Sequence, residues 1–199
     1  MWVSEKCCSL MMSKILYFIF LSIFLTQVSN AQIKNDIVTN LDNIESINFS
    51  FVQNTNNKEE IGECLLLFPG KLKCKYKNRY PKELIISGKT LTITIKKNKK
   101  INTYYYPISK SPFLNILDKN ELKKIINSSE IEYINSKINL KYISNTNQEI
   151  LLLFDKNSFD LLGWLINDQF DNEIKFLIKI NSKNDVIKKD TFKHPKFNN

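Results

Sequence analysis

The chain has 199 residues, of which 43% are hydrophobic and 25% are charged, and its formal net charge is +9. With a single histidine and four glycines, it lacks the parts for a histidine-rich metal site or a glycine-rich phosphate loop. A positive charge of this size is typical of proteins that bind nucleic acid, anionic lipid or an acidic protein. It is equally compatible with a lysine-rich surface that only keeps a protein soluble.

The first 31 residues have the order of features of a secretory signal peptide. Lys14 precedes an apolar run at residues 15–25, and the segment ends in the small residue Ala31. We expect cleavage after Ala31 and export of the protein. An uncleaved membrane anchor is the alternative, but the run is shorter than the ~20 residues that a bilayer span requires. Residues 32–199 are then expected to fold as a single domain.

A short helix and a series of strands are predicted after this segment. Ile33, Ile37, Leu41 and Ile44 recur at helical spacing, which indicates one amphipathic helix. From residue 47 the apolar period changes to two, which is typical of a half-buried strand. Similar runs, separated by Pro and Gly, predict an antiparallel meander with further strands at 61–68, 72–77, 83–87, 90–96 and 100–106.

A second helix is predicted over residues 111–126, with Ser111 as its N-cap and Pro112 as its first residue. Five more strands and a weak sixth follow, at 130–135, 138–144, 149–155, 160–167, 173–181 and 185–192. So many strands with only two or three helices predict a mainly β (α+β) fold. We expect a large, strongly curved antiparallel sheet with helices packed on one face.

Few residues suit catalysis, and we predict no enzymatic activity, no metal and no cofactor. His194 stands in a polar tail, where a lone histidine is typically solvated. Asp155, Asp168 and Asp171 fall at strand ends and turns, where aspartate caps backbone amides. A secreted hydrolase with paired carboxylates would need a clustered acid and base that the sequence does not contain.

Two cysteines flank the turn at Pro69-Gly70, with Cys64 and Cys74 ten positions apart. They have the same parity on the two predicted strands, so their side chains emerge on one face and nearly opposite each other. A disulfide is allowed in an oxidising compartment if the register is right. The alternative is that both are small apolar fillers of an inner face.

A basic run, Lys96–Lys100, is predicted at the tip of a hairpin. It is either a solvated turn or a docking patch for an acidic partner or anionic headgroups. The nearby aromatic run Tyr104–Tyr106 is compatible with base stacking, but tyrosine is common in strands and the protein is exported. We therefore predict no nucleic-acid partner.

The order of several short motifs resembles that of the LolA family of periplasmic lipoprotein carriers. Phe51-Val52-Gln53 is similar to the family's early Phe-x-Gln, and the segment from Phe68 to Tyr76 is similar to its Arg-Pro-Gly-Lys-Phe-Arg-Trp-x-Tyr hairpin. The other residues that carry the resemblance, in the family's order and approximate spacing, are Gly62, Pro81, Ser111-Pro112, Leu114, Leu117, Trp164, Asp168-Gln169, Asn181, Phe192 and Pro195.

This resemblance implies an unclosed β-barrel lidded by helices, with an apolar cavity for the acyl chains of lipoproteins. It also implies a monomer in the periplasm that is loaded by an inner-membrane ABC transporter and delivers to an outer-membrane acceptor. Phe68 stands where the family has an arginine that helps to fasten the lid by hydrogen bonds. Either an apolar contact at Phe68 holds the lid by packing instead, or the protein binds a different lipid. A lipid-binding or lipoprotein-binding sensor of the same fold, without a carrier role, is the alternative.

Strand parity selects the side chains that would line such a cavity, and for each of them ordinary core packing is the alternative. These candidates are Phe49, Phe51, Leu66, Leu91, Ile93, Ile95, Leu140, Tyr142, Trp164, Ile166, Phe176 and Ile178.

Overall fold

A computed structural model describes residues 30–78, 80–97, 100–108, 117–134, 136–144, 147–167 and 172–195. Most of the expected signal peptide, residues 1–29, lies outside this part of the chain, so the signal peptide and the single exported domain stay predictions. The chain divides into two compact units, Met1–Ile37 and Val38–Asn199. A helix at residues 30–42 begins in the first unit and ends in the second. Among the described residues, no helix is long and apolar enough to cross a membrane.

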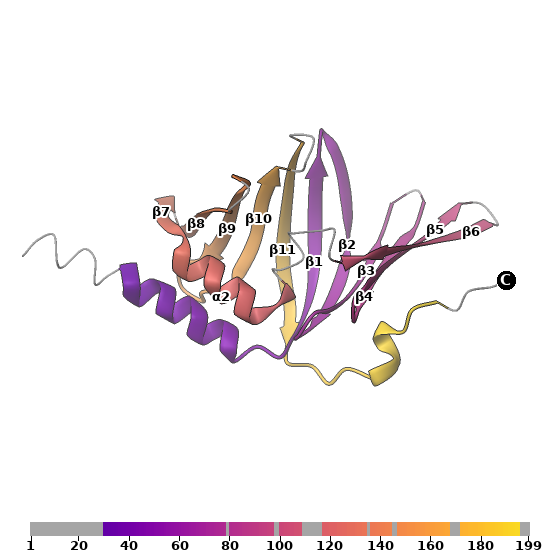
Figure 1. Cartoon of the computed structure of the whole chain (residues 1–199), viewed down its shortest axis with the longest axis horizontal. Coiled ribbons are helices and arrows are strands. Elements are labelled where there is room, and N and C mark those ends of the chain that lie inside the picture. The colour runs from indigo at the N-terminus through magenta and orange to yellow at the C-terminus, as the bar shows by residue number, and fades with distance from the viewer. Residues whose placement is uncertain are drawn as a thin grey trace, which may run out of the picture. The chain divides into compact units, whose positions relative to one another are not determined.

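The second unit contains one antiparallel sheet of eleven strands (Figure 1). Its order is β6-β5-β4-β3-β2-β1-β11-β10-β9-β8-β7, so the first and last strands of the chain pair at its centre. Since β6 and β7 form its two edges, the sheet is not closed into a barrel, and the predicted fold class is confirmed. The strands are β1 Ser46–Thr55, β2 Lys58–Leu67, β3 Lys71–Tyr76, β4 Lys82–Ser87, β5 Thr90–Lys97, β6 Lys100–Pro107, β7 Glu130–Ile134, β8 Lys137–Ile143, β9 Glu149–Asp155, β10 Leu161–Asn167 and β11 Glu173–Lys183.

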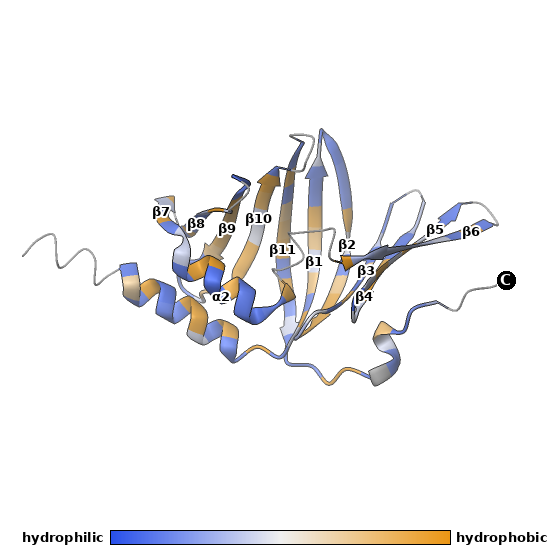
Figure 2. Cartoon of the chain, in the orientation of Figure 1, coloured by the Kyte–Doolittle hydropathy of each residue, from blue (hydrophilic) through white to orange (hydrophobic). Residues whose placement is uncertain are grey.

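One face of the sheet is apolar from strand to strand, and we call it the inner face. It is defined by Phe49 and Phe51 on β1. Directly paired residues of an antiparallel sheet point to the same side, so the register extends this face in both directions, for example through Cys64 and Cys74 to Leu84. Hydrophobic residues lie along the middle of β1, β9, β10 and β11, and the arrowhead end of β1 is hydrophilic (Figure 2).

The helix α2, Lys119–Ser128, begins later than the sequence predicts. Asp118 has an extended backbone, and its carboxylate accepts hydrogen bonds from the amides of Asn120 and Glu121. A continuous helix over 111–126 is therefore wrong, because Asp118 provides the cap. The predicted cap Ser111 and its neighbour Pro112 lie outside the described residues.

The apolar side of α2 is buried and places this helix against one end of the sheet. Leu122, Ile125 and Ile126 are its buried residues, and α2 contacts β8. The last turn of the first helix is held at the same end, since the Asn40 amide donates to Asp160 Oδ1 at 2.8 Å. An ion pair between Lys123 and Asp42 joins the two helices at 2.5 Å.

The C-terminal segment is not the weak strand predicted at 185–192. Residues 185–188 lack regular structure, and the 3-10 helix η3, Lys189–Phe192, follows. Both edges of β11 are already paired, one with β1 and the other with β10. The chain after β11 therefore cannot add a strand beside it and leaves the hydrogen-bonding plane of the sheet. Phe192 is buried, and η3 contacts β3 and β4.

His194 is held against the outer face, opposite the inner one, and is not a freely solvated residue of the tail. Its Nε2 lies 3.1 Å from the carbonyl oxygen of Ser87, and its Nδ1 is hydrogen-bonded to the hydroxyl of Thr92. The Tyr105 hydroxyl donates to the carbonyl oxygen of Pro195. Thr92 and Tyr105 are paired on the outer face, so the tail crosses β5 and β6 there.

Candidate functional site

All the residues predicted to line a cavity lie on the inner face. One row of direct pairs runs from Leu140 through Leu152 and Trp164 to Phe176, and another joins Phe51 to Ile178. The remaining candidates follow by alternation along these strands and along β2, β5 and β8. Their role in binding lipid stays a prediction.

Several of these residues pack as core. Leu140 is fully buried, and Phe49, Leu66 and Ile166 are nearly so. Because such side chains already touch protein on all sides in the described structure, they are not surfaces at which a ligand can dock without rearrangement. Ordinary packing therefore describes this part of the inner face in the structure.

Aromatic rings form a continuous cluster at the middle of the inner face. The rings of Trp164 and Phe176 are stacked with centroids 4.5 Å apart, and Phe176 stacks on Phe51 at 4.8 Å. Tyr76 meets Phe51 edge-on at 4.8 Å. Such contacts add to the burial of apolar area and fix these side chains.

Gly62 makes room for this cluster. An added Cβ there would lie 2.7 Å from the Phe51 ring and 2.3 Å from the carbonyl oxygen of Lys75. The Phe51 ring therefore lies directly over the backbone at Gly62, an arrangement that no other amino acid allows without movement of the strand.

A different part of the inner face is only partly covered by the described residues. Leu91, Ile93 and Ile95 on β5 are partly exposed, and their neighbours Tyr104 and Tyr106 on β6 are 46% and 47% exposed. Leu91 pairs with Tyr106 and Ile93 with Tyr104. We call these five residues the open apolar surface. The two tyrosines were not among the sequence candidates. Alternation along the predicted strand at 100–106 would have placed them on the same face as Leu91 and Ile93.

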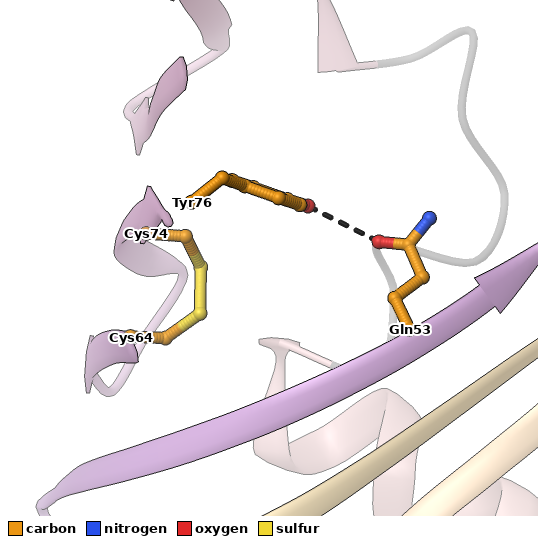
Figure 3. The surroundings of a disulfide bond; sticks show 4 residues. All are labelled: Gln53, Cys64, Cys74 and Tyr76. Carbon is orange, nitrogen blue, oxygen red and sulfur yellow. Dashed lines mark hydrogen bonds between the residues drawn. A yellow bond between two sulfur atoms is a disulfide. The ribbon is translucent and has the colours of Figure 1, made fainter. Parts of the chain in front are cut away.

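The cysteines are brought together on the inner face. Cys64 and Cys74 are directly paired between β2 and β3, with Cα atoms 4.1 Å apart, and their sulfurs form a disulfide (Figure 3). Both are buried. Tyr76 follows Cys74 by two residues on β3, and its hydroxyl donates to Gln53 Oε1 at 3.2 Å. The bond and this hydrogen bond hold β1, β2 and β3 beside the aromatic cluster.

Phe68, the residue at which the resemblance implies a lid contact, follows β2 and lies next to the beginning of α2. The Lys119 ammonium is 5.1 Å from the centroid of the Phe68 ring, and the Gly70 amide donates to the Leu117 carbonyl oxygen at 3.1 Å. The observed contact is a cation over an aromatic ring together with a backbone hydrogen bond. The apolar lid contact expected at Phe68 stays a prediction.

A cluster of charged and polar side chains lies at one end of the inner face. The Glu60 carboxylate accepts hydrogen bonds from the Lys82 ammonium, 3.1 Å from each oxygen, and from the Asn78 amide at 2.8 Å. The Lys82 nitrogen also lies 3.8 Å from the centroid of the Tyr76 ring. Burial raises the pKa of Tyr76, and the Glu60 carboxylate raises it further. A pocket of about 410 Å³ adjoins this group.

The described residues contain no group of three or more His, Cys, Asp or Glu placed to hold a metal ion. Asp155 accepts hydrogen bonds from the backbone amides of Asn157 and Ser158, which lower its pKa. This carboxylate is thus a turn cap. Asp168 and Asp171 lie outside the described residues.

The family model described as "Outer membrane lipoprotein carrier protein LolA" matches residues 42–195, which is most of the chain. The chain belongs to the LolA family. No curated protein matches significantly.

Several solved structures resemble the fold distantly. Lipoprotein LppX of Mycobacterium tuberculosis is 10% identical, with a TM-score of 0.46 over 80% of this chain and 98% of its own. A LolA superfamily protein of Nitrosomonas europaea is 10% identical, with a TM-score of 0.40 over 80% and 97%. The MucA/MucB complex of Pseudomonas aeruginosa is 9% identical, with a TM-score of 0.42 over 84% of this chain and 61% of that one. Because these TM-scores are below 0.5, the assignment depends on the family match.

Proposed function

We propose that the protein is a periplasmic carrier that binds the acyl chains of lipoproteins and shields them from water. Membership of the LolA family supports the ligand class. The observation that carries the proposal within the chain is the open apolar surface, which continues the inner face through the pairs of Leu91 with Ile86 and of Ile93 with Leu84.

The physical need for such a surface is simple. An exposed acyl chain is disfavoured in water by roughly 0.8 kcal/mol for each CH₂ group, so a lipoprotein does not cross an aqueous compartment unaided. Leu91, Ile93 and Ile95 offer partly exposed apolar area from which water is readily displaced. The fully packed residues around Trp164 serve instead as the rigid support of this surface.

The carrier role further assigns partners at the two ends of the route. We expect loading from an inner-membrane ABC transporter and delivery to an outer-membrane acceptor; the description of the family as an outer membrane lipoprotein carrier supports lipoproteins as the cargo. The contact of Phe68 and Gly70 with the beginning of α2 is the place at which a movable helix would be released. Binding of a ligand would shift the population toward the released state.

The direct test is binding of a fluorescent triacylated lipopeptide to the exported chain, followed by gel filtration. We expect the lipopeptide to elute with the protein, and the same peptide without acyl chains to elute alone. Absence of a soluble complex with the acylated peptide would overturn the proposal.

A matched pair of variants locates the binding surface. Ile93→Asp places a charge on the open apolar surface and should weaken lipopeptide binding about tenfold or more, since a carboxylate among acyl chains is costly. Thr94→Asp adds the same charge to the outer face of the same strand and should bind as the unmodified protein does. Equal losses in both variants would place the ligand elsewhere.

A further inference from the structure

The strand β6 forms one edge of the sheet (Figure 1), and the described residues place no strand on its side away from β5. Six of its eight residues are exposed, and Ile101 is 65% exposed. A strand in this position presents a row of backbone N–H and C=O groups to whatever lies beside it. The edge is therefore a surface that another extended chain can reach.

The ladder between β5 and β6 determines which backbone groups point to the open side. Just beyond β6, the Ile108 amide donates to the Lys89 carbonyl oxygen at 3.1 Å. Residues of an antiparallel strand alternately bond to their partner strand and point away from it. Counting back from Ile108 directs the N–H and C=O groups of Ile101 and Thr103 to the open side. Pro107 falls on the same alternation, at a position where the ladder needs no N–H donor.

The two edges of the sheet differ in how they are protected. Short strands, charged side chains and proline keep natural sheet edges from pairing with other chains. The opposite edge, β7, has only five residues, and two of them are Glu130 and Glu132. In contrast, β6 has eight residues, and Lys100 and Pro107 stand only at its two ends. The uncharged part between them, residues 101–106, is able to accept a further strand.

This edge adjoins the open apolar surface. Tyr104 and Tyr106 belong to that surface and lie on β6 itself, so a strand added beside β6 would lie only about 4.8 Å further along the sheet. The acyl chains of a lipoprotein are attached to its first residue. When these chains lie on the open apolar surface, the residues that follow the first one leave it within reach of β6.

We propose that the open edge of β6 binds, as an additional β-strand, the extended polypeptide segment that directly follows the lipidated residue of a lipoprotein. Ile101 and Thr103 supply N–H donors and C=O acceptors to this segment. Main-chain hydrogen bonds give affinity to an added strand and depend little on its sequence, so one edge serves segments of different sequence. This inference rests on the proposed carrier function and adds the polypeptide part of the cargo to what is bound.

Backbone methylation of the cargo tests the added strand. A triacylated lipopeptide with a long uncharged segment is compared with two forms that carry N-methyl groups on four consecutive residues, either directly after the lipidated residue or at the far end. We expect the first form to bind about tenfold more weakly, the effect of losing one or two hydrogen bonds. The second form is the control and should bind as the unmethylated peptide does. Equal affinities of all three peptides would overturn the proposal.

A matched pair of variants assigns the effect to β6. Thr103→Pro removes an amide donor from the open edge, where proline is tolerated. Thr103→Ala keeps this donor, and both variants lose the hydroxyl that lies 3.3 Å from the Thr94 hydroxyl. The proline variant should bind the unmethylated lipopeptide about tenfold more weakly than the alanine variant does. With the peptide methylated next to its lipidated residue, the two variants should bind alike. An equal loss with every peptide would contradict the edge contact.

The same measurements separate this inference from the carrier function. If all three lipopeptides bind equally well, the added strand is wrong and the carrier function stands. If none of them binds, the carrier function itself fails. Gel filtration without lipopeptide tests a second copy of the chain as the occupant of the edge. A dimer that Thr103→Pro converts to a monomer would overturn the proposal in favour of that copy.

Discussion

The contact between Gly62 and Phe51 sets how closely the aromatic cluster approaches the sheet. A Cβ at Gly62 would collide with the Phe51 ring and the Lys75 carbonyl oxygen, so Gly62→Ala should lower the free energy of unfolding by ~1–3 kcal/mol, the usual cost of overpacking. Urea unfolding measures this. The control Glu63→Ala removes only an exposed ion pair with Lys77 and should have a much smaller effect. Equal effects of the two substitutions would contradict the structure.

The buried hydroxyl of Tyr76 makes stability depend on alkaline pH. Since the folded-state pKa of Tyr76 lies above its usual value near 10, its contribution to stability is complete below pH 10 and is lost as the pH rises further. Tyr76→Phe should lower the free energy of unfolding by about 1 kcal/mol at pH 8, because Gln53 loses its donor. The variant should also lose less stability than the unmodified protein between pH 8 and pH 11. Identical pH profiles would contradict this account.

At the scale of elements, the disulfide joins the two strands of the β2–β3 hairpin. Closing a loop of this length in the unfolded chain contributes about 2–3 kcal/mol, so a reductant should lower the free energy of unfolding by that amount. The variant carrying both Cys64→Ala and Cys74→Ala should be insensitive to the reductant. Mass spectrometry of the non-reduced exported protein should find no free thiol. Two free thiols would show that the cysteines are only apolar fillers.

The elements also show how far the sequence predicts this fold. Alternating apolar residues located the strands from 47 to 181 and placed Cys64 opposite Cys74, because these features depend on local pattern and short turns. The beginning of α2 was missed because Asp118 competes with Ser111 as a cap, and both are good N-cap residues. The path of the tail around Phe192 and His194 depends on tertiary contacts that no local pattern encodes.

For the whole molecule, strand parity predicted which residues lie on the inner face. It did not predict which of them are buried and which are partly exposed. Leu140 and Ile93 have the same hydrophobic pattern, yet the first is fully buried and the second partly exposed. The difference depends on where α2 contacts the sheet, at β8, far along the sheet from β5. The sequence therefore identified the candidate residues, whereas only the fold separates rigid support from available surface.

The central claim is that acyl chains lie on the open apolar surface of β5 and β6. A photoreactive amino acid in place of Ile93, on the inner face, or of Thr94, on the outer face, tests it most directly in the presence of a triacylated lipopeptide. We predict that irradiation cross-links the lipopeptide at position 93 and not at 94. Cross-linking at both positions to the same extent, or at neither while a soluble complex still forms, would contradict the account.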